Sequence, residues 1–161
     1  MKISIPSIYA QIPLREYDEQ MQDLFAQVWV NPSLDLMREQ LAITQERVRI
    51  LSADYSGEEE ETKPDVMDRM SRRLEALNEL RPREYAWLAD ILGHGGDSEK
   101  RWSPDAQELE DSYQTSPDFM AWLTERVTTA ITDHRAREKK VSAPRSMAEK
   151  RGAAPESTTP S

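Results

Sequence analysis

The sequence predicts an all-α fold: a helical hairpin or bundle with coiled-coil-like long helices, followed by a disordered C-terminal tail. Apolar residues recur at alternating spacings of three and four in separate segments, which is the pattern of one apolar stripe along a helix. Proline stands at several expected helix starts, where its missing N–H costs nothing. The four stripes comprise Leu14, Tyr17, Met21, Leu24 and Val28; Leu34, Met37, Leu41, Thr44, Val48 and Leu51; Met67, Met70, Leu74 and Leu77; and Met120, Leu123, Val127 and Ala130.

The first thirteen residues are harder to assign. Ile3, Ile5 and Ile8 fit either a short strand or an extended arm that packs on a neighbour. We expect an arm, because a short strand in an otherwise helical chain has nothing to satisfy its backbone edge.

The helices are expected in chain order from these stripes and from their N-terminal signals. Serine is a good N-cap before the last two, and the following aspartates favour the positive end of the helix dipole. A run of four glutamates should form a hairpin loop; it could in principle bind a cation or a basic partner, but like charges in a loop are usually solvated. The expected helices cover Leu14 to Val30, Ser33 to Asp54, Pro64 to Leu80 and Pro82 to Gly93, and two more begin at Ser103-Pro104-Asp105 and Ser116-Pro117-Asp118.

Composition divides the chain into an N-terminal arm (1–13), a helical domain (14–140) and a basic tail (141–161) that we expect to be disordered. Residues 134–161 hold 7 Lys and Arg against 3 Glu, whereas residues 1–133 hold 14 basic and 27 acidic residues. The tail can be solvated charge, or it can neutralise nucleic-acid phosphates. Its basic residues are Arg135, Arg137, Lys139, Lys140, Arg145, Lys150 and Arg151.

A thin core points to association. The apolar fraction is 37%, or about 40% with the 5 glycines, which is below the usual range for globular chains. An elongated helical pair buries too little surface to offset chain entropy by itself. We therefore expect a homo-oligomer or a complex with a protein partner, with an interface formed by Leu34, Met37, Leu41, Val48, Leu51, Met67, Met70, Leu74 and Leu77.

Several classes of protein are disfavoured. The chain has no cysteine, which excludes disulfides and thiolate chemistry, and no apolar run approaches the ~20 residues of a membrane span. We expect a cytoplasmic protein. His94 and His134 are the only histidines, no ligand cluster or triad accompanies them, and carboxylate pairs are uninformative in so acidic a chain. We expect no enzymatic activity, metal or cofactor.

Two local motifs have alternatives. Gly93-His94-Gly95-Gly96 could cradle a phosphate, but it lacks the spacing of such loops and fits a helix C-cap better. Trp87 to Gly93 resembles the start of a DNA-reading helix-turn-helix, although Asp97 to Arg101 does not continue it; the alternative is an ordinary packed helix. The tryptophans are expected to be core or interface anchors.

The stretch Asn31 to Leu51, NPSLDLMREQLAITQERVRIL, resembles the long central helix of terminase small subunits from tailed phages. The matching features are the Asn-Pro-Ser-Leu opening, Arg38, and the Leu41-Ala42-Ile43 step before Arg47. The resemblance implies a non-enzymatic, ring-forming protein in the host cytoplasm that recognises the viral genome and engages the large terminase subunit.

Two hypotheses follow. The first is an oligomeric assembly or DNA-packaging adaptor. The second is an acidic helical chaperone or inhibitor, such as a tail-assembly chaperone or a nucleic-acid mimic, that binds a basic protein partner. In either case Leu41, Val48 and Leu51 are expected to be buried in the association of the long helices with the helix at Met67 to Leu80.

Overall fold

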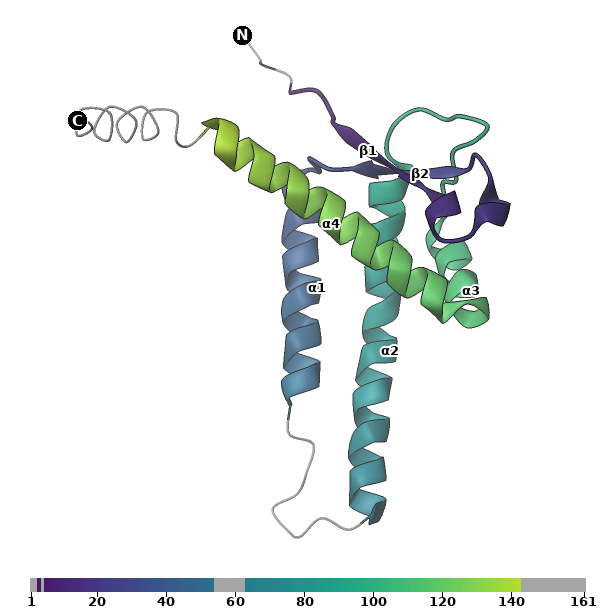
Figure 1. Cartoon of the computed structure of the whole chain (residues 1–161). Helices are drawn as coiled ribbons and strands as arrows, with labels where there is room; N and C mark the ends of the chain where they lie inside the picture. Colours follow the sequence, from purple (N-terminus) through teal and green to yellow (C-terminus); the bar gives the residue numbers. More distant parts are fainter. Residues whose placement is uncertain (1–2, 4, 54–62, 143–161) are drawn as a thin grey trace, which may run out of the picture.

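The computed structural model describes residues 3, 5–53 and 63–142, and these form a mostly α-helical chain with one small sheet. Two long helices stand side by side as a stalk, and the other elements gather as a head at one end (Figure 1). We use "stalk" for helix α1, Leu34–Ser52, with residues 63–80 of helix α2, Lys63–Gly93, and "head" for the remainder. The predicted mostly helical fold class is confirmed.

The head contains a two-stranded antiparallel sheet, β1 Tyr9–Pro13 and β2 Phe25–Trp29, in which Gln11 pairs with Gln27. Two short 3-10 helices, η1 Leu14–Glu16 and η2 Glu19–Met21, connect the strands. The expected helix from Leu14 to Val30 is therefore wrong. After Leu24 every second side chain is buried, which is the pattern of a strand. The spacing of three and four among the apolar residues of this segment is therefore coincidental.

The first residues were also only partly predicted. Tyr9–Pro13 is a strand because β2, which we had expected to be helical, supplies the missing backbone partner. Residues 5–8 precede the strand and are exposed, as an arm would be. Figure 1 shows this segment leaving the head instead of folding back over it.

Helix α1 begins where its sequence predicts. The Ser33 hydroxyl accepts a hydrogen bond from the Leu36 N–H at 3.3 Å, which caps the helix. Helix α2 differs from expectation, since it continues through Pro82 instead of breaking into two. Proline removes one backbone hydrogen bond, but α2 is held to its neighbours on both sides of Pro82: Arg81 lies over the Tyr113 ring of α3, and the Trp87 indole donates to the Leu36 carbonyl of α1. That packing holds both halves in one helix.

The last two helices, α3 Ala106–Thr115 and α4 Pro117–Ser142, start close to the predicted positions. Asp105, and not Ser103, caps α3 by accepting a hydrogen bond from the Glu108 N–H at 2.8 Å. Helix α4 continues to residue 142; the rest of the expected tail, and the predicted glutamate loop, lie outside the described residues.

The core lies mainly in the head, where the sheet, the end of α2, α3 and α4 meet, and it continues into the stalk at Ile43, Ile50 and Leu80. Its fully buried side chains are supplied mainly by α2 and α4, and aromatic rings surround them. Trp102 and Trp122 both contact Phe119, with ring centroids 5.6 and 5.9 Å apart. Trp87 joins head to stalk, because its indole N–H donates to the Leu36 carbonyl at 2.9 Å. The largest fully buried residues are Ile12, Val28, Ile50, Ile91, Leu92, Leu109, Leu123, Val127 and Ile131.

Candidate functional site

Helix α1 carries two apolar stripes. The inner stripe packs on α2: Ile43 and Ile50 retain only 5% and 1% of their exposure. The outer stripe is the one that the sequence analysis singled out, and there Leu41 and Val48 are 58% and 59% exposed. The expectation that Leu41, Val48 and Leu51 pack against the Met67–Leu80 helix is therefore wrong within the single chain, because the inner stripe already occupies that contact.

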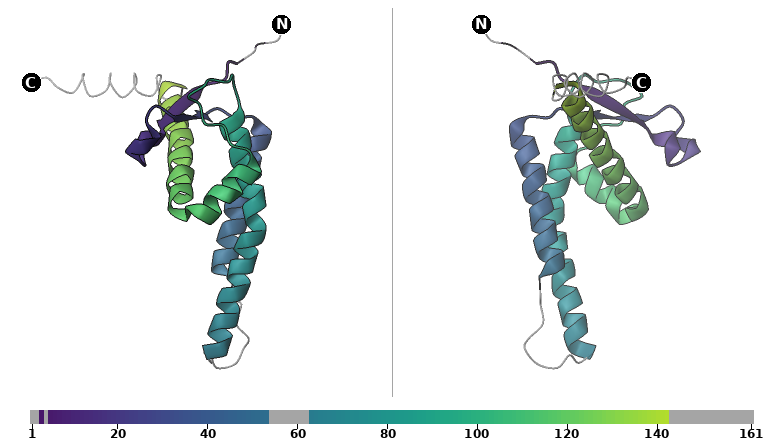
Figure 2. Two further views of the ribbon diagram at one scale, coloured as in Figure 1. Left: turned by 90° about the vertical axis from the view of Figure 1, so that its right-hand side faces the viewer. Right: turned by 60° about the vertical axis from the view of Figure 1, so that its left-hand side comes forward.

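Helix α2 continues the same exposed surface. Met67, Met70 and Leu74 are exposed, whereas Leu77 is partly buried against the core. Figure 2 shows that the sheet, α3 and α4 leave the far part of the stalk uncovered from both additional directions. We call the set the outer apolar face; it comprises the half-buried Met37 and the exposed residues Leu34, Leu41, Val48, Leu51, Val66, Met67, Met70 and Leu74.

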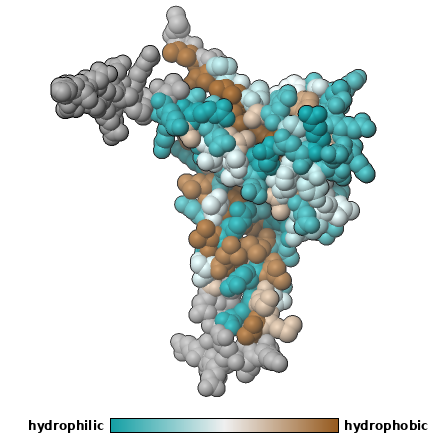
Figure 3. Space-filling model, viewed as in Figure 1, coloured by the Kyte–Doolittle hydropathy of each residue, from teal (hydrophilic) through white to brown (hydrophobic). Residues whose placement is uncertain are grey.

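Figure 3 shows hydrophobic residues gathered on the stalk, while the facing side of the head is largely hydrophilic. Eight of the thirteen exposed large hydrophobic residues of the described chain belong to the stalk. A monomeric soluble protein rarely exposes a contiguous apolar patch of this kind unless the patch binds something. The outer apolar face is therefore the candidate functional site.

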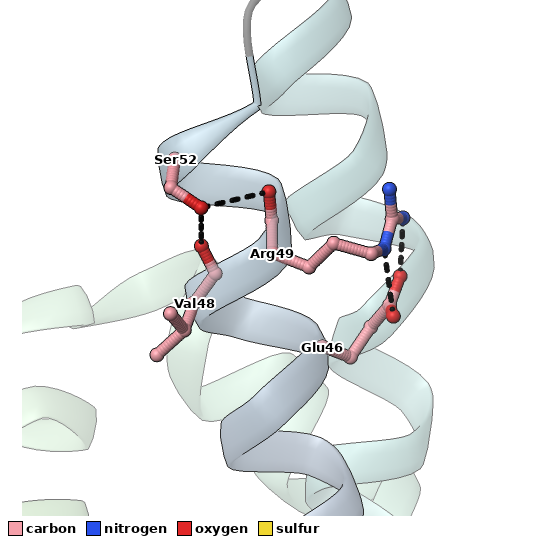
Figure 4. Close-up of polar contacts among 4 residues, drawn as sticks. All are labelled: Glu46, Val48, Arg49 and Ser52. Atoms are coloured by element: carbon pink, nitrogen blue, oxygen red, sulfur yellow. Dashed lines mark hydrogen bonds and ion pairs between the residues drawn. The ribbon is translucent and has the colours of Figure 1, made fainter.

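One pair of charges beside this face, Glu46 and Arg49, is paired within α1. The Arg49 guanidinium donates to both carboxylate oxygens of Glu46, at 3.0 and 2.5 Å, and Ser52 donates to the carbonyls of Val48 and Arg49 (Figure 4). The hydrogen bond from Arg49 lowers the pKa of the Glu46 carboxyl, so this carboxylate stays ionised at neutral pH. These three polar side chains are thus satisfied within α1, whereas Val48 and Leu51 beside them are exposed in the described chain.

The stalk is also electrically balanced. Residues 34–52 contain three acidic and three basic side chains, and residues 66–80 contain the same numbers. The excess negative charge is in two other segments: residues 97–118, around α3, contain seven acidic and two basic residues, and residues 54–62, which join α1 to α2, contain five acidic residues and no basic one. The outer apolar face therefore has no net charge to repel a second copy of itself.

The predicted nucleic-acid-binding residues are only partly described. Arg135, Arg137, Lys139 and Lys140 are exposed on the last turns of α4, and an Arg135 Nη lies 3.5 Å from the Gln40 side chain. Arg145, Lys150 and Arg151 lie outside the described residues. The helix-turn-helix alternative does not fit, because the next helix after Gly93 begins only at Ala106, too far along the chain for its short turn.

The two histidines have structural contacts. His94 Nδ1 lies 2.7 Å from the Tyr9 hydroxyl, and the ring stacks on Trp29 with centroids 3.6 Å apart. His134 lies 3.9 Å from Glu138, one turn further along α4. Among the described residues no group of three or more histidine or acidic side chains could hold a metal ion. In the same residues, no helix combines the length and apolarity needed to cross a membrane.

The residues that sequence reasoning missed lie mainly in the inner stripe. Ile43 and Ile50 repeat at an interval of seven, as the outer stripe does, so spacing alone could not tell which stripe meets α2. Val66 was missed because it immediately precedes the expected stripe. The chain matches no protein-family model, no curated protein and no solved structure. The fold and site therefore define only a class: a helical-hairpin protein with an uncovered apolar stalk.

Proposed function

We propose that the protein is a non-enzymatic, oligomeric assembly adaptor whose copies associate through the outer apolar face. The observation that carries this proposal is the concentration of exposed large apolar residues on the stalk. Burying one such side chain fully contributes about 1.5–3 kcal/mol, so burial of even half of this surface in several residues can offset the entropy of association.

A second copy of the chain is the occupant that the charges favour. The stalk has equal numbers of acidic and basic residues, whereas the chain as a whole has a net charge of −9. A strongly basic partner would gain little from a neutral stalk. Two stalks offer each other matching stripes at helical spacing, which is the arrangement that helix-to-helix packing requires.

The test is the absolute molar mass of the full chain in solution, measured by light scattering over a range of concentrations. The parent chain should form an assembly, and Leu41→Asp with Met70→Asp should reduce it to single chains without loss of helical circular dichroism. Arg38→Gln with Gln45→Glu is the matched control, because these two changes at exposed positions also make the charge more negative by two without removing apolar surface. A parent chain that is a monomer at every concentration contradicts the proposal.

The packaging form of the adaptor, a small terminase subunit, adds a prediction about DNA. The basic end of α4 should then retain DNA in a manner that weakens as salt is raised. Exchange of Arg135, Arg137, Lys139 and Lys140 for glutamine should weaken retention. Assembly without any DNA retention would support an adaptor that joins proteins only.

The acidic surface around α3 favours a second candidate, a chaperone or inhibitor that binds a basic protein. Seven of the nine charged residues in 97–118 are acidic, and of these Glu110 is 3.6 Å from Arg81. A monomer that shuns DNA at every salt concentration would favour this candidate. An assembly that dissociates into single chains when Leu41→Asp and Met70→Asp are introduced would favour the adaptor.

A further inference from the structure

The arm before β1 is held in place but its apolar side chains are not covered. Asn31 extends the sheet by one step: its side-chain oxygen accepts from the Ile8 N–H at 2.6 Å, and its amide donates to the Pro6 carbonyl at 3.0 Å. The Val30 N–H donates to the Ile8 carbonyl at 3.0 Å. Yet Ile3 and Ile5 are 87% and 79% exposed.

Pinning the arm in this way prepares it to bind. Asn31 fixes the direction of the backbone as far as Pro6, so less conformational entropy remains to be lost when the preceding residues dock. Ile3 and Ile5 are two positions apart, which places them on the same face of an extended segment. The arm therefore presents a pair of β-branched side chains with no cover among the described residues.

An apolar groove lies beside the same asparagine. It has a volume of about 380 Å³ and runs between the junction of β2 with α1 and the last turns of α4. Val30, Pro32 and Met37 supply its apolar lining, and His134, Arg135, Glu138 and Lys139 line it from α4. Long basic side chains can lay their aliphatic stems along such a surface and keep their charges in water. The groove suits an uncharged aliphatic segment.

Met37 connects this groove to the outer apolar face, since it belongs to both. A second stalk packed in parallel on that face would bring its own head next to the groove. Packed helices lie ~8–10 Å apart. Five residues of extended chain, from Ile8 back to Ile3, span at most ~17 Å, so the arm is long enough to cross to the neighbour.

We propose that Ile3 and Ile5 of one copy occupy the groove at Val30, Pro32 and Met37 of the adjacent copy. We call this arrangement the exchange of arms. It rests on the proposed self-association of the stalks, and it requires in addition that the two stalks run parallel. It also explains why the chain holds its arm away from its own head.

The chain has no cysteine, which makes directed cross-linking clean. Ile5→Cys chains are mixed with Met37→Cys chains of different tag length, oxidised, and separated without reducing agent. A covalent pair containing one chain of each kind is expected. Gln107→Cys, exposed on α3, replaces Met37→Cys as the matched control and should give no such pair. The double variant Ile5→Cys with Met37→Cys tests whether the arm reaches the groove of its own chain.

A second measurement does not depend on oxidation. Ile3→Ser with Ile5→Ser should raise the concentration at which the assembly half-dissociates by about tenfold or more, because two aliphatic side chains leave an apolar site. Ser7→Ala, also exposed in the arm, should leave it unchanged. An intact assembly with no link between chains, or with links only within a chain, overturns the exchange of arms but leaves the adaptor standing. Single chains in light scattering overturn both.

Discussion

At the scale of single residues, Arg101 has the most consequential environment. Among the described residues it is the one charged residue that is buried, with 8% of its surface exposed. Its guanidinium donates to the carbonyls of Leu92, His94 and Gly96, at 2.6 to 2.7 Å. A cation is favoured at this place because the carbonyl end of α2 carries partial negative charge. Arg101 thus fastens the loop after α2 to the helix end.

Replacing Arg101 with methionine should lower the free energy of unfolding by about 2–4 kcal/mol, since three carbonyls would lose a charged donor in a buried place. Lys100→Met is the matched control. Lys100 pairs with Asp23 at 3.0 Å, but both side chains are exposed, so its loss should change stability by no more than about 0.5 kcal/mol. Urea unfolding followed by circular dichroism measures both. Equal effects would contradict the capping role.

Tyr85 gives a prediction at alkaline pH. Burial raises the pKa of its hydroxyl from 10.0 to about 12, although the nearby Arg81 charge opposes the change. The unfolded chain therefore ionises at this tyrosine first, and stability should fall as pH rises from 10 towards 12. Tyr85→Phe should make that fall shallower, as measured by thermal melts across this range. Tyr17→Phe, an exposed position on the head, serves for comparison.

At the scale of elements, the sequence correctly predicted the helices whose starts are marked by a capping residue or a proline. The caps and prolines located α1, α3 and α4 to within a few residues, because those signals act on neighbouring backbone groups. The sheet was missed because Leu14 to Val28 happens to match a helical spacing. The alternation of buried and half-buried residues after Leu24 belongs to a strand, and this becomes clear only from the pairing of β1 with β2. That pairing depends on contacts between residues far apart in the sequence.

Pro82 is a second position where a local signal in the sequence did not decide the structure, because the helix break that it predicts does not occur. A proline inside a helix normally costs ~3 kcal/mol, yet α2 continues through it because both sides are packed. Pro82→Ala restores the missing N–H at an exposed position and should raise the free energy of unfolding by about 1–3 kcal/mol. Pro117→Ala, at the first position of α4, should instead be neutral or slightly destabilising. Denaturant midpoints compare the two; a destabilised Pro82→Ala would mean that the proline shape is needed.

Most residues of the outer apolar face were named from the sequence, but Leu77 is partly buried instead and Val66 was missed. Spacing identified the stripe through Leu41 and Val48 correctly as one surface of the helix. It could not show that Ile43 and Ile50 would take the contact with α2, since both stripes are apolar and repeat alike. Which stripe faces its own chain depends on how the connected helices are rotated, and that is fixed by tertiary packing in the head.

At the scale of the whole molecule, charge and apolar surface are separated. The stalk helices are neutral and apolar on their outer face, whereas acidic residues are concentrated around α3 and in the segment 54–62 that joins α1 to α2. Because association through the stalk would be driven by burial of apolar surface, raising the salt from ~0.1 to ~1 M should leave it unchanged or strengthen it. Light scattering at both salt concentrations measures this. Dissociation at high salt would indicate charge pairing as the main attraction.

The placement of the tryptophans has a spectroscopic consequence. Trp29, Trp102 and Trp122 lie in the head, and Trp87 lies on α2 beyond the stalk residues. Tryptophan emission therefore reports on the head, while the amide ellipticity near 222 nm, the usual helix band, weights the long stalk helices heavily. Melting curves recorded by the two signals on one sample will separate if the stalk frays before the head unfolds. The chain thus carries its own pair of reporters for two regions of different stability.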